Sequence, residues 1–209
     1  MEYKQSEKMA GRKQARRRRF LDVAIAQFGR LGYHAVTVPA IVAESQSSTG
    51  AFYLYFRNKE DVYVAALEEI GGRLATAING AMLKQSRPEA RMDSAVRAFV
   101  EWLAGNPAEA RMLVEAAALG GRIEQARRAI IESHVRSVSI ALEQVAPWFD
   151  ADERTVVARC WVGSVLEAAM GWLSTAPEER MEAERVAAIV AEFNLRGAGL
   201  GGGGRTGES

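Results

Sequence analysis

The chain of 209 residues is poor in the side chains from which many functional sites are built. Cys160 is its one cysteine, which excludes a disulfide framework and a zinc site made of cysteines. Its two histidines, His34 and His134, lie far apart in the sequence, so we expect no histidine-rich metal site. No apolar segment of the kind found in secretory signals follows the basic start of the chain. We therefore expect a reduced, cytoplasmic protein that carries no metal and no other cofactor.

Motifs of common enzymes are also missing. The sequence contains no nucleophile elbow, no glycine-rich phosphate loop after a strand, and no pair of carboxylates at a defined spacing. Ser133 beside His134, and Ser139 near Glu143, are weak candidates for a nucleophile set. We therefore expect a protein without enzymatic activity.

The net charge of +1 conceals a strong asymmetry along the chain. Residues 1–59 contain eleven Lys or Arg and four acids, a net charge of +7, whereas the remaining residues carry −6. A basic end on an acidic body is expected when that end meets a polyanion. A solvated basic tail would give the same asymmetry, because four of the eleven form the run Arg16–Arg19. Charge alone leaves nucleic acid and a solvated tail as alternatives.

Apolar residues recur at intervals of three and four along most of the chain, as in Leu21, Ala24, Ile25 and Phe28. No segment alternates long enough to be a strand, so we predict an all-α fold. The predicted helices cover 12–31, 38–45, 48–55, 58–84, 89–104, 107–118, 122–146, 151–174 and 178–195.

Helix starts are marked by capping residues followed three positions later by an acid, or by a proline in the first turn. The last thirteen residues, 197–209, contain seven glycines and cannot bury enough surface to offset their ordering entropy. We predict a disordered tail there. The predicted helix starts are Asn58 with Asp61, Asn106-Pro107 with Glu109, Asp150 with Glu153, and Thr175-Ala176-Pro177.

Residues 37–56 form the pattern of a helix-turn-helix. Thr37 can cap a short helix that turns Ile41 and Val42 inward, and a polar break follows it. A second short helix begins at Ser47 or Ser48 and is rich in hydroxyl and aromatic side chains. The helix predicted at 12–31 would complete a compact three-helix unit. Helix hairpins also occur in proteins that bind no nucleic acid, so spacing alone leaves both readings open.

The run from Phe20 to Lys59, FLDVAIAQFGRLGYHAVTVPAIVAESQSSTGAFYLYFRNK, resembles the DNA-binding domain of TetR-type transcriptional regulators. The order and spacing of the motifs carry the resemblance. The matching features are Ala24 and Phe28, Gly32-Tyr33, Thr37, Ile41-Val42-Ala43, Ser48, Gly50, the string Phe52-Tyr53-Leu54-Tyr55-Phe56, and Asn58-Lys59-Glu60-Asp61.

Two departures from the family pattern stand in and after the turn. Ser45-Gln46-Ser47 replaces the usual Ala-Gly-Val, so a left-handed backbone position would fall on Gln46 at some cost. Thr49 replaces the lysine usual before the glycine, which puts one expected phosphate contact in doubt. We still expect DNA binding, with an altered operator preference.

Helix geometry and the resemblance together assign roles in DNA binding. Phe52 and Phe56 should face the core of the three-helix unit. The side chains expected to face the major groove are Thr49, Ala51, Leu54 and Tyr55. The resemblance implies phosphate contacts by Tyr53, Thr37 and Lys59. We expect Arg16–Arg19 to add contacts to the DNA backbone or minor groove from an N-terminal arm. The candidate DNA-binding residues are Thr37, Ser48, Thr49, Ala51, Tyr53, Leu54, Tyr55, Lys59, Arg16, Arg17, Arg18 and Arg19.

The helix predicted at 151–174 is apolar nearly all round, with only Arg159 and Glu167 charged between Val156 and Trp172. Those two charges argue against a membrane span. The resemblance implies that the last two helices pair with their copies in a homodimer, although both apolar stripes could be core of a single chain. Candidate interface residues are Gly163, Ser164, Ala168, Gly171, Val186, Ile189, Val190 and Phe193.

The middle helices should enclose an effector pocket, because many large apolar side chains and few polar ones suit a lipophilic or amphipathic ligand. Taken singly, each of these side chains is better explained as core. The candidates are Ile78, Met82, Phe99, Trp102, Leu103, Met112, Leu113, Glu115, His134, Val138, Trp148 and Trp161.

The sequence therefore predicts a DNA-binding domain over 1–58, an effector-binding and dimerisation domain over 59–196, and a tail over 197–209. The resemblance implies a transcriptional repressor that leaves a palindromic operator when a small lipophilic effector binds, with helix 58–84 carrying the signal. The alternative is a helical protein-interaction module whose DNA-binding head has degenerated.

Overall fold

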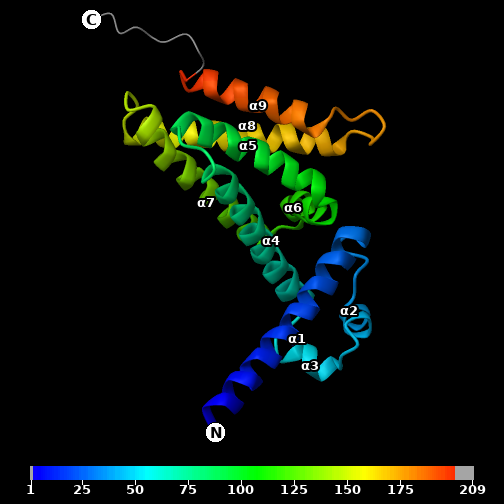
Figure 1. The fold of residues 1–209 in the computed structure, drawn as a ribbon. Coiled ribbons are helices and arrows are strands. Elements are labelled where there is room, and N and C mark those ends of the chain that lie inside the picture. Colours follow the sequence, from blue (N-terminus) through cyan, green and yellow to red (C-terminus); the bar gives the residue numbers. More distant parts are fainter. Residues whose placement is uncertain (1, 201–209) are drawn as a thin grey trace, which may run out of the picture. The chain divides into compact units, whose positions relative to one another are not determined.

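The computed structural model describes the backbone of residues 2–200 and the side chains of residues 11–200. Within that range the chain forms nine α-helices and no strand, as Figure 1 shows, so the all-α prediction is confirmed. The helices are α1 (Glu2–Leu31), α2 (Val38–Glu44), α3 (Thr49–Tyr53), α4 (Lys59–Met82), α5 (Pro88–Gly105), α6 (Pro107–Leu119), α7 (Gly121–Val145), α8 (Ala151–Ser174) and α9 (Ala183–Gly197).

Two helix starts were predicted wrongly. α1 begins at Glu2 rather than at residue 12, because the stretch before Phe20 contains no proline and is rich in good helix formers. α9 begins at Ala183 rather than at residue 178. Arg180 instead donates hydrogen bonds to the carbonyls of Leu173 and Thr175, which closes the last turn of α8 with a loop.

The predicted caps are mostly confirmed. Asp150 and Glu153 form a capping box at the start of α8, and the side chain of Asn58 accepts from the amide of Asp61 at 2.8 Å. α6 begins at Pro107 as predicted, but the side chain of Asn106 acts differently, because its amide donates back to the carbonyl of Trp102 and closes α5. The predicted tail begins too early, because Gly197 is the last residue of α9 and Ala198 is its buried C-cap. The rest of the predicted tail, 201–209, lies outside the described residues.

The described chain forms two compact units. The first, which we call the head unit, comprises the residues up to Ile70 together with Pro107–Arg127. The second, the body unit, comprises Gly71–Asn106 and the residues from Arg128 onward. The head unit therefore contains α6 and the first turns of α7 in addition to the predicted helix-turn-helix.

Aromatic rings fill the core of the head unit. Phe20 meets Phe52 edge-on at 5.5 Å between ring centres, and Phe28 meets Tyr63 in the same way at 4.7 Å. α6 lies directly on α1, where a Cβ at Gly29 would overlap the Cβ and the backbone of Ala108. Only glycine at this position allows the two helix backbones to approach so closely.

The body unit is built on α5, α7, α8 and α9, with α9 packed mainly on α5 and also on α8. α8 buries one stripe of side chains: Ala158, Trp161, Val162, Val165 and Ala169. The hydroxyl of Ser164 lies 2.9 Å from the buried side-chain oxygen of Asn194, a polar contact that fixes the alignment of α8 with α9.

Among the described helices, α8 alone is long and apolar enough to cross a bilayer by length and composition. Its surroundings are those of a bundle helix. One face is packed against neighbouring helices, and Arg159 on another face makes two hydrogen bonds, of 2.6 and 3.0 Å, with Glu132 of α7.

Candidate nucleic-acid interface

The two short helices α2 and α3 are each capped as their sequence predicts. The hydroxyl of Thr37 accepts from the amide of Ala40 at 3.3 Å, and the hydroxyl of Ser48 accepts from the amide of Ala51 at 3.2 Å. Ile41 of α2 and Phe52 of α3 are fully buried. The caps and the buried anchors fix both helices against α1, so the outer surface of α3 is held in one orientation.

The turn between α2 and α3 contains the left-handed residue that the sequence predicts. Gln46 has a φ of +49°, a conformation that glycine adopts at lower cost. Its side-chain oxygen accepts from the guanidinium of Arg19 at 2.9 Å, and the hydroxyl of the buried Ser45 donates to the carbonyl of Ile41 at 2.6 Å. These two side-chain bonds hold a turn that lacks its usual glycine.

The outer surface of α3 exposes four of the predicted DNA-binding side chains. Leu54 is 73% exposed and Tyr53 is 54% exposed, and Ser48 and Thr49 are also on the surface. Ala51 is half-buried. Such a surface offers apolar groups for thymine methyls and hydroxyls for phosphates or base edges.

Tyr55 lies differently from the other predicted contacts. α3 ends at Tyr53, so the helix is shorter than the predicted 48–55, and Tyr55 follows its C-cap. The ring of Tyr55 is half-buried, 6.1 Å from the ring of Phe20 and 6.4 Å from that of Phe56. Its ring therefore packs on the core of the head unit.

Three of the four arginines in the run 16–19 have partners inside the protein. Arg17 lies over the ring of Phe56 at 5.6 Å. Arg18 pairs with Asp22 at 3.1 Å and with Glu69 at 2.7 Å, and Arg19 binds Gln46. Arg16 is exposed, and none of the described residues forms a hydrogen bond or ion pair with it.

Lys59, a predicted phosphate contact, is also engaged within the head unit. Its ammonium donates to the carbonyl of Tyr33 at 2.9 Å and lies 4.3 Å from the centre of the Tyr33 ring. These contacts join the first turn of α4 to the loop between α1 and α2. Thr37, at the start of α2, is exposed.

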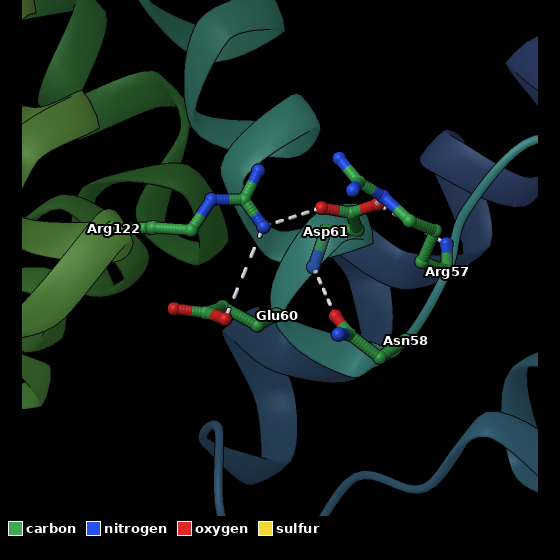
Figure 2. A network of polar contacts seen from close by, with 5 residues as sticks. All are labelled: Arg57, Asn58, Glu60, Asp61 and Arg122. Atoms are coloured by element: carbon green, nitrogen blue, oxygen red, sulfur yellow. Dashed lines mark hydrogen bonds and ion pairs between the residues drawn. The ribbon is translucent and has the colours of Figure 1, made fainter.

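A polar network anchors the first turn of α4, as Figure 2 shows. Asp61 accepts from the guanidinium of Arg122, in the first turn of α7, at 2.5 Å, and from the backbone amide and guanidinium of Arg57 at 3.1 Å each. Glu60 lies 4.0 Å from the same Arg122. The Arg122 hydrogen bond, followed by those from Arg57, lowers the pKa of Asp61 to about 2.

α6 is joined to the head unit by polar contacts that the sequence did not predict. Glu115 accepts from the backbone amide of Tyr33 at 2.9 Å, and the hydroxyl of Tyr63 donates to the carbonyl of Met112 at 3.0 Å. Arg111 donates to the carbonyl of Arg30 at 3.0 Å. Burial and the nearby Glu115 carboxylate raise the pKa of the Tyr63 phenol, which stays protonated as a donor.

The predicted effector residues are divided between the two units. Met112, Leu113 and Glu115 belong to the head unit, where Met112 is buried and Glu115 forms the contact just described. Trp148 is 53% exposed and lies 3.4 Å from the position that a Cβ on Gly199 would take. The remaining members belong to the body unit: Ile78, Met82, Phe99, Trp102, Leu103, His134, Val138 and Trp161.

Within that body-unit set, Phe99, Leu103 and Trp161 are buried and the others are half-buried. Burial lowers the pKa of His134, which favours the neutral imidazole. Among the described residues, no three His, Cys, Asp or Glu side chains lie close enough to hold a metal ion.

The predicted dimer residues fall on two faces. Val186 and Val190 are buried within the chain, whereas Ile189 is 52% exposed and Phe193 is 65% exposed. On α8, Gly163 and Gly171 are exposed, and Ser164 and Ala168 are half-buried. Val156, at the N-terminal end of the same exposed stripe, is 61% exposed and was not among the predicted residues.

Gln27 is a further residue that sequence reasoning missed. It is buried on the inner face of α1, where it donates to the carbonyl of Ala40 at 3.2 Å and to the carboxylate of Glu44 at 2.6 Å. A polar residue beside Ala24 and Phe28 on an otherwise apolar face was the available signal. No comparable signal marks Asp61 with Arg122, since the two lie far apart in the sequence.

The comparison with protein families agrees with the resemblance predicted for the N-terminal segment. Residues 20–66 match the model of the tetR family of bacterial regulatory proteins. The sequence is also similar to the fatty acid metabolism regulator protein of Bacillus subtilis, with 24% identity over 86 residues. That match covers 41% of this chain and 44% of the relative, so it spans less than half of either protein.

The fold as a whole is similar to solved regulators. The fatty acid degradation regulator FadR of Bacillus halodurans superposes with a TM-score of 0.75 at 19% identity, covering 87% of this chain and 95% of that one. The regulator FadR of Bacillus subtilis in complex with stearoyl-CoA superposes with a TM-score of 0.74 at 18% identity, covering 86% and 97%. Together with the family match, these similarities confirm the resemblance to TetR-type regulators and the predicted fold class.

Proposed function

We propose that this chain, whose residues 20–66 carry the N-terminal domain of the tetR family, is a sequence-specific DNA-binding regulator of transcription. The observation that carries the proposal is the outer surface of α3, where exposed Thr49, Tyr53 and Leu54 stand on a buried aromatic core. A helix presented in this way can enter a major groove and read base edges. We propose that it works in the cytoplasm, as the sequence predicts.

A homodimer would place two such surfaces on one duplex and match a palindromic operator. The apolar stripe of α8 and α9 around Val156, Ile189 and Phe193 supports this assembly, because it leaves large apolar side chains in water on a single chain. The small residues Gly163 and Gly171 beside that stripe allow another helix to approach closely.

The proposed effector is a long-chain acyl-CoA or a similar amphipathic molecule. In the simplest scheme, its binding releases the protein from DNA. The support is the fold shared with a regulator solved with stearoyl-CoA, together with the large apolar side chains of the body unit. A ligand that favours one conformation by about 1–3 kcal/mol changes operator occupancy many-fold. The protein then acts as a repressor that the effector removes from DNA.

The first experiment is a selection of random duplex DNA by the purified protein, followed by sequencing of the retained fragments. We expect an enriched inverted repeat. Replacing Leu54 by Ala should alter the preferred sequence, while replacing the exposed Val114, also in the head unit but on α6, should not. Weak, salt-sensitive binding without enrichment would instead favour a protein-interaction module with a degenerate head.

The second experiment tests the effector with the selected operator. Stearoyl-CoA should release the protein from DNA and raise its melting temperature, whereas coenzyme A alone should do neither. Release by free coenzyme A, or no response to any acyl chain length, would contradict the proposed ligand class and leave the DNA-binding proposal intact.

A further inference from the structure

α1 continues well beyond the helices that pack on it. Its N-terminal turns extend past α2 and α3, as Figure 1 shows. Residues 11–19 are exposed throughout, and they contain six basic side chains and no acid. This stretch, which we call the basic extension, precedes the segment that matches the family model, which begins at residue 20.

The basic side chains of the extension fall into two groups. Arg17, Arg18 and Arg19 are held by Phe56, by Asp22 with Glu69, and by Gln46. Arg12, Lys13 and Arg16 are exposed, and no described residue forms a hydrogen bond or ion pair with them. The second group therefore presents three charges that no described residue neutralises.

The register of α1 places this second group on the side of the helix against which α3 packs. Arg12, Lys13 and Arg16 precede Phe20 by eight, seven and four positions, spacings that share one face of a helix. Phe20 is fully buried against Phe52 of α3. The three cations therefore continue, along α1, the face on which α3 lies.

The basic extension has little to stabilise it as a helix within the protein. The extension buries no apolar side chain, Gly11 has no neighbour within 4 Å at its Cβ position, and like charges one turn apart repel one another. A polyanion along this face would remove the repulsion and would need no particular sequence of its own.

We propose that Arg12, Lys13 and Arg16 bind the phosphate backbone of duplex DNA flanking the base pairs read by α3. The inference rests on the proposed function and adds to it a second, sequence-independent contact. At about 1.5 Å per residue, these side chains stand about 6–12 Å beyond Phe20 along α1, a distance of roughly two to four base pairs. The length of DNA that each head unit contacts is then greater than the stretch of base pairs that α3 reads.

The test uses the full chain and two operator fragments. One fragment ends at the selected inverted repeat, and the other adds about six base pairs of random sequence on each side. The wild-type protein should bind the longer fragment at least about tenfold more tightly at moderate salt. The variant Arg12→Gln/Lys13→Gln/Arg16→Gln should bind both fragments with equal affinity. The slope of the logarithm of its binding constant against the logarithm of salt concentration should be smaller in magnitude by about two to three for each head unit.

A matched control removes the same charge from the body unit. Lys84, Arg87 and Arg136 are exposed there, and Lys84→Gln/Arg87→Gln/Arg136→Gln should keep the wild-type preference for the longer fragment. An unchanged preference in the extension variant would overturn the inference while operator selection still supports the proposed function. If the wild-type protein binds no fragment at all, the proposed function fails and this inference fails with it.

Two further outcomes distinguish the partner and the bound conformation. Binding of the wild-type protein to vesicles of equal parts phosphatidylserine and phosphatidylcholine, lost in the extension variant while both DNA affinities stay unchanged, would show that the partner is a membrane. Gly11→Ala favours the helix and should tighten binding to the longer fragment by about two- to fivefold. Weaker binding by Gly11→Ala would overturn a helical contact in favour of an unwound arm.

Discussion

The head unit and the body unit solve the burial of apolar surface in different ways. The head unit closes its core with aromatic rings from α1, α3 and α4, and exposes large apolar side chains chiefly at Tyr53 and Leu54 on the proposed reading surface. The body unit buries aliphatic side chains between long helices, yet Val156, Ile189 and Phe193 remain in water. The head unit therefore buries most of its large apolar side chains, whereas the body unit leaves an apolar face exposed on α8 and α9, which is the proposed dimer face.

Polar contacts join distant segments in both units. In the head unit, hydrogen bonds link Glu115 with Tyr33 and Arg122 with Asp61. In the body unit, the buried Asn194 aligns α8 with α9, and Arg159 of α8 binds Glu132 of α7. The two units therefore differ in the apolar side chains that they leave exposed rather than in the kind of bond that holds them.

The largest expected effect tests how much the buried aromatic core of the head unit contributes to stability. Phe52→Ala should lower the free energy of unfolding by about 3–5 kcal/mol, because it leaves a cavity against Phe20 and Phe56. Urea denaturation followed by circular dichroism measures it. Tyr53→Ala, at the adjacent exposed position, should cost less than about 1 kcal/mol. Equal losses in the two variants would contradict the burial seen at Phe52.

The next effect tests whether the body face is an interface. Phe193→Glu should place a charge on the proposed dimer face, where Phe193 is exposed, and weaken association by about 2 kcal/mol or more. Sedimentation velocity over a range of concentrations measures the shift. Ile140→Glu, at another exposed apolar residue of the body unit, should leave association unchanged. A dimer that survives Phe193→Glu would place the interface elsewhere.

A smaller effect tests the polar contacts of the head unit. The lowered pKa of Asp61 means that its contribution is present above its ordinary value of 3.8 and is lost as the pH falls toward about 2. Asp61→Asn should cost about 1–2 kcal/mol at neutral pH, allowing for solvent screening, and less in acid. Unfolding by urea at several pH values checks this, with the exposed Asp22→Asn as control.

The smallest expected effect concerns the turn before α3. Gln46→Gly should relieve the left-handed conformation and lose only an exposed hydrogen bond to Arg19, raising stability by about 0.5–1 kcal/mol. Thermal denaturation measures the change, and Arg19→Ala separates the contribution of the hydrogen bond. A loss of stability in Gln46→Gly would mean that the side-chain contact outweighs the backbone strain.

Local signals in the sequence predicted much of the fold. The caps at Thr37, Ser48 and Asp150 were recognisable because a cap depends on residues only three positions apart. The left-handed Gln46 was predicted because the family places glycine there. The exposure of Leu54 was predicted from helical register, and that of Tyr53 from the family resemblance.

What the sequence did not predict depended on contacts between distant segments. The start of α9 was predicted too early, because Arg180 closes the end of α8 through hydrogen bonds that hydrophobic periodicity does not indicate. Lys59 stays a predicted phosphate contact, but its hydrogen bond to the carbonyl of Tyr33 was not predicted. Glu115 stays a predicted pocket residue, and nothing in its sequence neighbours indicated that its carboxylate would accept from the amide of Tyr33.

The place of α6 in the head unit also sets an order of events at the ribosome. Residues up to Ile70 emerge well before Pro107–Arg127, yet Gly29 packs on Ala108 and Tyr33 binds Glu115. The head unit therefore cannot finish folding when α1, α2 and α3 leave the exit tunnel. It waits until α6 and the start of α7 have been made, so a nascent chain stalled within α5 carries an unfinished head.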